Sequence, residues 1–567
     1  MKAISSARPT RRILGKGIFV MMTFSALVLP SVRAGSLWWR VDGTGATLTS
    51  SNWSTTGSAP FTNAWVNSSD IIFNATSAIT NVTNTPVGNI TLANGITVTW
   101  TAAGTFNTGS AVRTVTVGDN STLTWNGQTV STAGSTGFIK SGNGTWDVGA
   151  QGNAYTGGFT LNAGTVIAGG NNALGGGALT INGGIWQSSG TRVYADTSLV
   201  IGGDFTLTGT GNAILHSATA TISLGSATRT ITNSTTSGSR QLTGVISGGT
   251  GAGLTFAGTG AAQIYIGNSA NTFDGPVAIT GGEVVFNDNG AFGNTSSITI
   301  DGGRLTMASM AANGNTSPLT AASIASSRNI SVGAGAGTSI SIQSSTGVTT
   351  YNGVIADETG STGAWAKQGA GTLKLGGAST YSGATAINNG TLQITTGSDR
   401  LPTATTVSIG QAVSTNLGTL DLGGFNQQIA GLNSTTGTNA TATKNTVTTS
   451  TGSSTLTLGG SGTYSYGDGT AANSGAITGA VSLVKQGSGT QTLGDANTYT
   501  GTTTVTGGTL LVSGSATGSI TSAATVSNSG STLGGSGRVA DVTINTGAAL
   551  QGGDGLQPRA PSPPREM

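Results

Sequence analysis

The chain has 567 residues, of which 95 are glycine, none is cysteine and only 7% are charged, with a net charge of +3. So few charged residues exclude an ordinary assembly of amphipathic helices, whose solvated faces need them, and leave no basic stripe for nucleic acid. The lack of cysteine excludes disulfides, thiol catalysis and thiolate metal sites.

Residues 1–34 have the composition of a cleaved secretory signal peptide. Basic residues precede an apolar stretch from Gly17 to Val32, and Val32-Arg33-Ala34 stands at the expected cleavage site. The apolar stretch is short for a membrane-spanning helix. Six of the 22 basic residues lie in this segment, so the rest of the chain has 16 basic and 19 acidic residues. We therefore expect an exported protein whose mature net charge is slightly negative.

Residues 35–139 are predicted to form the N-terminal, tryptophan-rich turns and cap of the fold. Eight of the nine tryptophans lie between Trp38 and Trp186. Their rings could plug the open first turn of a stacked array, which has no neighbour on one side. Alternatively, they could form a surface on which sugars stack. We favour the plug, because the end of a stacked array has to be covered.

Residues 140–555 carry a sequence repeat in four copies. The copies begin at Lys140, Gly258, Lys367 and Lys485, and each contains an aromatic residue followed by glycine two and nine positions later. These aromatic residues are Tyr155, Phe273, Tyr381 and Tyr499. A repeat of this length built from short strands is a supercycle of smaller structural turns.

Within the repeat, apolar residues occupy alternate positions. In the last copy they are Val505, Leu510 and Val512, and Gly-Gly or Asn-Gly pairs supply the turns between strands. A period of two predicts strands in which Leu510 and Val512 face the core and Thr509 faces solvent. We also expect Tyr499 to pack against the turn. Residues of about 433–454, mostly Thr, Ser, Asn and Gly, are predicted to form an extended loop outside the core.

The repeat begins with GxGT, continues with N/S-T-Y-T/S-G and ends with GGTL or NGTL, most clearly in the copies at Lys367 and Lys485 and least clearly in the copy at Gly258. In these motifs it resembles the autotransporter-associated beta-strand repeat of bacterial passenger proteins. The resemblance implies an all-β fold, a right-handed parallel β-helix or β-solenoid. It also implies a protein that is secreted or displayed on the bacterial cell surface.

No stretch of the chain shows a recognisable catalytic, cofactor or metal-binding pattern. The single histidine, His216, has no ligand cluster around it, and the adjacent Asp357 and Glu358 would face opposite sides of a strand. Residues 35–555 contain only 18 acidic side chains, too few to favour the clustered acids of a β-helical enzyme. We therefore predict no catalytic, cofactor-binding or metal-binding residues.

The favoured hypothesis is a non-catalytic exported β-solenoid that serves as a surface or secreted passenger or scaffold, with adhesion as its use. Its partner would be a surface ligand such as a polysaccharide or extracellular matrix, not nucleic acid. It would contact a membrane only through a C-terminal translocator that this chain does not contain. The alternative is a β-helical polysaccharide-degrading or carbohydrate-binding protein, for which several carboxylates and basic groups should converge in one groove.

The chain changes character after Gly555. Residues 556–567, LQPRAPSPPREM, contain four of the 11 prolines. Proline cannot donate to a strand ladder, so we predict a proline-rich disordered tail that does not continue the stack. The tail is either a deliberate cap or the product of a shifted reading frame or truncated gene model, and we favour the latter.

Overall fold

The structure is a computed structural model of the chain. It describes residues 37–39, 46–47 and 53–54 and, from 70 to 553, all residues except 82–86, 101–103, 107–110, 126–127, 131–135, 151, 154, 195–197, 215–219, 260–262, 311–315, 318–320, 344, 413, 436–443, 468–474 and 514–518. The expected signal peptide (1–34), His216 and the proline-rich tail (556–567) lie outside the described residues.

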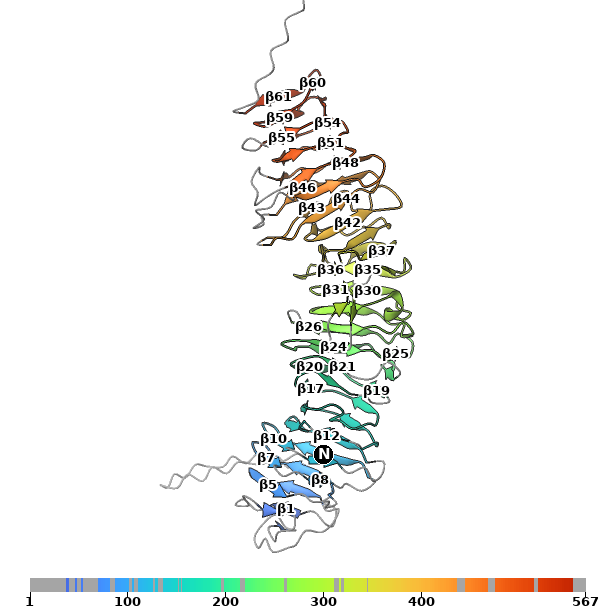
Figure 1. The fold of residues 1–567 in the computed structure, drawn as a ribbon, viewed down its shortest axis with the longest axis vertical. Helices are drawn as coiled ribbons and strands as arrows, with labels where there is room; N and C mark the ends of the chain where they lie inside the picture. Colours follow the sequence, from blue (N-terminus) through green and yellow to red (C-terminus); the bar gives the residue numbers. More distant parts are fainter. Residues whose placement is uncertain are drawn as a thin grey trace, which may run out of the picture.

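Short strands of successive turns stack into long parallel sheets that run along a curved rod (Figure 1). The first sheet has 11 strands, the second 14 and the third 11, followed by smaller sheets of seven, six, five and three strands towards the C-terminal end. The first sheet extends from β3 (Trp53–Ser54) to β25 (Val245–Ser247), the second from β2 (Ala46–Thr47) to β38 (Ile355–Asp357), and the third from β18 (Arg192–Val193) to β46 (Gly431–Ser434). The seven-stranded sheet extends from β34 (Ala321–Ile324) to β50 (Gly475–Ile477), and the six-stranded sheet from β45 (Gln427–Ile429) to β60 (Val542–Ile544). The five-stranded sheet extends from β49 (Thr463–Tyr466) to β61 (Ala549–Gly552), and the three-stranded sheet from β53 (Ala496–Asn497) to β59 (Arg538–Val539).

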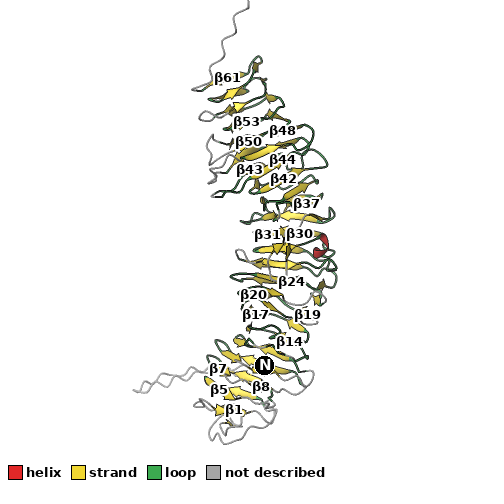
Figure 2. Ribbon diagram, in the orientation of Figure 1, coloured by secondary structure: helices red, strands yellow, loops and turns green. Residues whose placement is uncertain are grey.

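The predicted all-β solenoid is confirmed. Across the described ranges, the only helix is the single 3-10 turn η1 (Asn289–Phe292), drawn in red in Figure 2. No helix in this part of the chain has both the length and the apolar character needed to cross a membrane. Strands on both sides of residue 139 belong to the same sheets, because β9 (Arg113–Val117) pairs with β12 (Phe138–Ser141).

Alternation along each strand, repeated in register from turn to turn, builds a narrow core. In the strands β40 (Thr372–Leu375), β42 (Gly390–Ile394) and β44 (Gly418–Asp421), Leu373, Leu392 and Leu420 are direct partners and all are buried. The threonines that precede them form a parallel outward row. One continuous hydrophobic core runs from Ile71 to Leu533. Each turn therefore contributes one layer of apolar side chains that its two neighbours cover.

The inward and outward directions predicted for the repeat are confirmed. In the last copy, β54 (Thr503–Val505) and β55 (Thr509–Val512) place Leu510 and Val512 at 0% exposure, while Thr509 is half-buried. Tyr499 is also fully buried, and its hydroxyl shares a 2.6 Å hydrogen bond with that of Thr503. The aromatic residue thus anchors the turn that leads into the next strand.

The prediction of a tryptophan plug at the N-terminal end is wrong for the four early tryptophans whose side chains the structure describes. Trp100, Trp125, Trp146 and Trp186 are 0–2% exposed and lie inside successive turns. The rings of Trp100 and Trp125 are 5.6 Å apart between centroids, and those of Trp125 and Trp146 are 4.6 Å apart. Trp100 and Trp125 are register partners and Trp125 meets Trp146 edge to face, so these three rings form an internal aromatic cluster, whereas Trp186 packs against Tyr194. Burial also rules out sugar stacking on these four rings.

The extended loop predicted for about 433–454 is also wrong over much of its length. The segment contains the end of β46 and the whole of β47 (Asn445–Thr448), whose Val447 is fully buried, and β48 (Ser454–Leu458) begins at its end. Residues 436–443 lie outside the described residues. Threonine favours strands when its hydroxyl faces solvent, so a Thr-rich composition did not mark a loop here.

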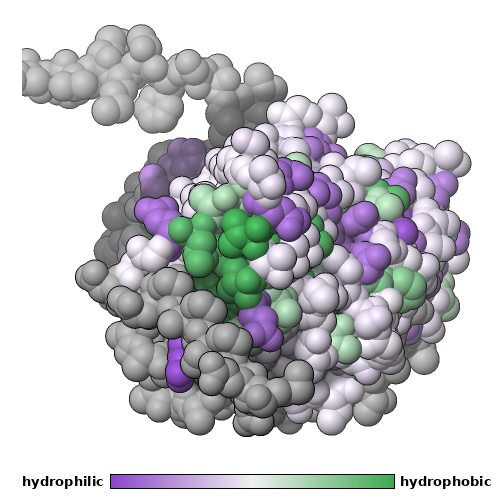
Figure 3. Space-filling view, turned by 90° about the horizontal axis from the view of Figure 1, so that it is seen from above, coloured by the Kyte–Doolittle hydropathy of each residue, from purple (hydrophilic) through white to green (hydrophobic). Residues whose placement is uncertain are grey.

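At the C-terminal end of the described residues, the last turn has no covering layer. Val542, Ile544 and Leu550 are 36–42% exposed, although they are the register partners of Ala524, Val526 and Leu533, which are 0–1% exposed. Figure 3, which views this end of the rod, shows apolar side chains gathered on it. Inward-facing residues are buried here only when the next turn is present.

Candidate functional site

The sequence predicted no site residues, and the structure places the acidic pair at 357 and 358 at the end of β38, where the chain leaves the strand. Asp357 Oδ1 accepts hydrogen bonds from the backbone N–H groups of Gly363 at 2.7 Å and Ser382 at 2.9 Å. Burial opposes ionisation of this carboxyl, but the hydrogen bonds from Ser382 and Gly363 lower its pKa. Within the described part of the chain, no three His, Asp or Glu side chains gather as a metal site. Asp357 therefore has a structural role.

Three copies of the repeat contain a lysine that is buried in the core. Lys140, Lys367 and Lys485 are 0–1% exposed. The Lys367 Nζ donates to the backbone carbonyls of Gln368, Gly369 and Asn389 at 2.8–2.9 Å. Lys140 and Lys485 make the equivalent three bonds, at 2.6–3.1 Å. Each ammonium group thus joins the glycine turn that follows it to the same corner one turn later.

Two opposing effects act on these ammonium groups. Burial lowers the pKa of Lys140 to about 8 and that of Lys367 to about 7, and it also lowers the pKa of Lys485. Three carbonyl acceptors around each Nζ favour the charged form. A buried lysine without such acceptors would be strongly destabilising, so the carbonyls explain why this position tolerates lysine.

The second copy differs from the other three at this corner. Strand register identifies its equivalent of the lysine: Phe256 pairs with Ile279, just as Lys367 pairs with Ile387 and Lys485 with Val505. Phe256 is 1% exposed and supplies no donor. A second change follows the glycine turn, where Glu283 replaces the threonine of the other copies, such as Thr509.

A cavity of about 520 Å³ lies at this corner. Its lining includes Gly258 and Gly281, the equivalents of two residues whose carbonyls accept from the lysine in the other copies. The remaining lining residues are Thr280, Gly282, Glu283, Gly302, Gly303, Arg304, Ala336 and Gly337. Glycine is required at Gly282 and Gly302 because their φ angles are +68° and +88°. The floor of the cavity is therefore largely backbone.

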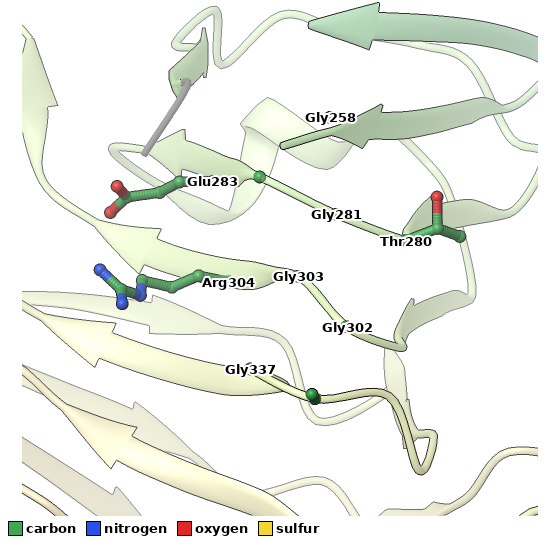
Figure 4. A pocket seen from close by; sticks show the side chains of 10 residues that line it. Gly258, Thr280, Gly281, Glu283, Gly302, Gly303, Arg304 and Gly337 are labelled. Atoms are coloured by element: carbon green, nitrogen blue, oxygen red, sulfur yellow. The ribbon is translucent and has the colours of Figure 1, made fainter. Parts of the chain in front are cut away.

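Two charged side chains lie together at the cavity. Glu283 in β29 (Glu283–Phe286) and Arg304 in β31 (Arg304–Met307) are register partners, and Figure 4 shows their side chains extending in the same direction from adjacent strands. Glu283 is 6% exposed; its Oε2 accepts from Gln263 Nε2 at 2.9 Å and its Oε1 accepts from the Thr306 hydroxyl. The carboxylate is thus held in place from both sides.

Arg304 is held less firmly than Glu283. Its Nε is buried and has no hydrogen-bond partner within the described ranges. The cavity lining therefore combines a fixed acceptor, Glu283, with a guanidinium whose buried Nε has no hydrogen-bond partner among the described residues.

Sequence reasoning missed both the lysines and the cavity, although the repeat alignment carried a signal for each. Lysine begins three of the four copies at an inward-facing position, which is unusual for a charged residue. In the degenerate copy, Glu283 stands where the other copies have threonine. Differences between the copies mark this corner better than any motif within one copy.

The fold and its internal repeats define the class of protein: a parallel β-solenoid of the kind expected of an autotransporter passenger. Residues 138–168, 366–394 and 483–512 match the family described as passenger-associated-transport-repeat. The chain thus carries three copies of this repeat, which coincide with the three copies that contain a buried lysine. No curated protein and no solved structure matches the chain.

Proposed function

We propose that this protein is a non-catalytic, exported passenger-type scaffold that presents an adhesive surface outside the bacterial cell. The observation that carries the proposal is the set of three passenger-associated repeats within one continuous solenoid. Residues 1–34 serve as the cleaved leader, and the coil is right-handed, as crossovers between parallel strands almost always are. A rigid rod without disulfides suits a scaffold whose stability comes from stacked backbone hydrogen bonds and a narrow core.

Export can be tested with the full chain and its own leader. In a Gram-negative host we expect the mature protein outside the cytoplasm, in the periplasmic, cell-surface or medium fraction, with an N-terminus at Gly35 by mass spectrometry. The matched control is Leu27→Arg, which interrupts the apolar stretch of the leader and should keep the protein in the cytoplasm with residues 1–34 attached. Retention of both proteins in the cytoplasm would overturn the proposal.

A second candidate function, recognition or cleavage of a glycan, is favoured by the cavity at Glu283 and Arg304. Hydrolysis of a glycosidic bond by the usual mechanism needs two carboxyl groups that flank the bond. Among the residues that line this cavity, Glu283 supplies the single carboxylate. The arrangement therefore suits binding better than cleavage.

A further inference from the structure

We propose that the cavity of the second repeat copy is a binding site for a neutral sugar unit, and that it supplies the adhesive contact of the scaffold. The inference rests on the proposed function for its biological use, but not for its chemistry. It begins from the comparison of four equivalent corners within one chain.

In three copies the corner is occupied by the chain itself. A Cβ placed on Gly164 would lie 2.7 Å from Lys140 Nζ, so the ammonium lies against the glycine turn. In the second copy, Gly282 is the equivalent of the turn glycine Gly164. Gly258 and Gly281 are the equivalents of two residues whose carbonyls accept from the lysine in the other copies. All three glycines line the 520 Å³ cavity. The second copy has lost the internal cation at the corner where this space opens.

The size and shape of the space suit a small ligand. Ligand-binding cavities commonly measure about 300–1,000 Å³, and one or two pyranose rings fit within this range. Because the floor is glycine backbone from four successive turns, a ring can approach the main chain closely. A Cβ on Gly302 or Gly337 would lie 3.3 Å or 3.4 Å from its nearest neighbour, whereas a Cβ on Gly281 or Gly303 would lie only 2.3 Å or 2.4 Å away, so the floor is least crowded at Gly302 and Gly337.

The polar groups define the class of ligand. Each Glu283 oxygen accepts one hydrogen bond from the protein, and a carboxylate oxygen can accept a second. Arg304 lines the cavity, and its buried Nε–H has no hydrogen-bond partner among the described residues. A pair of neighbouring sugar hydroxyls can donate to the carboxylate and accept from the guanidinium. Since the charges of Glu283 and Arg304 cancel, the site favours a neutral sugar over a uronic acid.

None of the described residues that line the cavity has an aromatic ring on which a sugar could stack. Tyr265, in the neighbouring strand β27 (Gln263–Ile266), is 6% exposed, and a Cβ on Gly267 would meet its ring. Its ring thus lies near Gly267, beyond the far end of the strand from the cavity. We therefore expect weak binding, with a dissociation constant of about 1 mM, which repeated contacts on a surface would strengthen.

The site can be tested by ligand-observed NMR on the purified full chain, with a panel of neutral oligosaccharides (maltotriose, cellotriose, galactobiose and N,N′-diacetylchitobiose) and digalacturonate. We expect binding of at least one neutral sugar to be detected when the sugar is present at about 10 mM. Glu283→Gln and Arg304→Gln should each weaken this binding by about tenfold or more. Lys374→Gln, a change at an outward-facing residue of a later turn, should leave binding unchanged.

Phe256→Lys is the sharpest variant, because it restores the residue that fills this corner in the other copies. It should abolish binding while the far-UV circular dichroism spectrum stays that of a β-solenoid. If Phe256→Lys fails to fold, the loss of sugar binding in Glu283→Gln and Arg304→Gln tests the site instead. The proposal is overturned if no neutral sugar binds, if only digalacturonate binds, or if binding survives both polar substitutions. Normal export without sugar binding would refute the binding site and leave the proposed scaffold function standing. Sugar binding without export would refute the scaffold function and leave the binding site standing.

Discussion

Replacing Lys367 by methionine should destabilise its repeat copy, because the side chain keeps its length but loses three hydrogen bonds. The three carbonyl acceptors belong to Gln368, Gly369 and Asn389 and lie 2.8–2.9 Å from Nζ. Each buried carbonyl left without its partner costs about 1–3 kcal/mol, so three of them cost about 3–9 kcal/mol. Removing a buried cation recovers part of this cost, so we expect a net loss of about 2–4 kcal/mol in local unfolding free energy.

The matched control is Lys374→Met, the same substitution seven residues later. Lys374 lies at a half-buried, outward position of β40, and surface changes of this kind usually stay within about 0.5 kcal/mol. Hydrogen exchange read by mass spectrometry reports opening around each substituted residue, which matters because a solenoid can open locally. Equal protection in both variants would refute the assignment of Lys367 as a fastener between turns.

The same lysines predict how stability depends on pH. Burial lowers the pKa of Lys367 to about 7 and that of Lys140 to about 8, whereas lysines of the unfolded chain keep a pKa of about 10.4. Between these values the unfolded state binds more protons, so the free energy of unfolding should rise with pH from about 7 to about 10. Lys367→Met should reduce this rise. A flat profile for the unmodified protein would show that the carbonyls outweigh burial.

Three further predictions test the architecture. Leu510→Ala should cost about 2–5 kcal/mol locally and Thr509→Ala no more than about 0.5 kcal/mol; pulse proteolysis that found both equally mild would contradict their inward and outward assignment. Small-angle scattering should show a rod on the order of 100 Å long, because the 14 strands of the second sheet alone span about 60 Å at the usual strand spacing, and a compact particle would exclude the solenoid. Ile544→Thr should change the free energy of unfolding by less than about 0.5 kcal/mol. Val526 is the buried register partner of Ile544, and Val526→Thr should lower the free energy of unfolding by about 1–3 kcal/mol. Thermal melts that reversed this order would show that the end of the rod is covered.

Much of the fold could be predicted from the sequence, because strand geometry is local. Alternation of apolar and polar residues assigns Leu510 to the core and Thr509 to the surface without knowledge of any neighbour. Glycine nine positions after each aromatic residue marks the turn, since positive φ angles such as +69° at Gly390 and +61° at Gly508 favour it. The passenger-associated repeats were recognisable for the same reason, in three of the four copies.

What the tertiary structure alone decided depends on which residues of successive turns meet. Trp100, Trp125 and Trp146 are more than 20 residues apart in sequence, and only the packing of successive turns brings their rings together in the core. Lys367 is polar at an inward position, and the reason emerges only when carbonyls from two turns converge on its Nζ. The cavity beside Glu283 lies at the corner where Phe256 stands at the register position of the lysine in the other copies. Local periodicity determines the direction of each side chain, whereas stacking determines what that side chain meets.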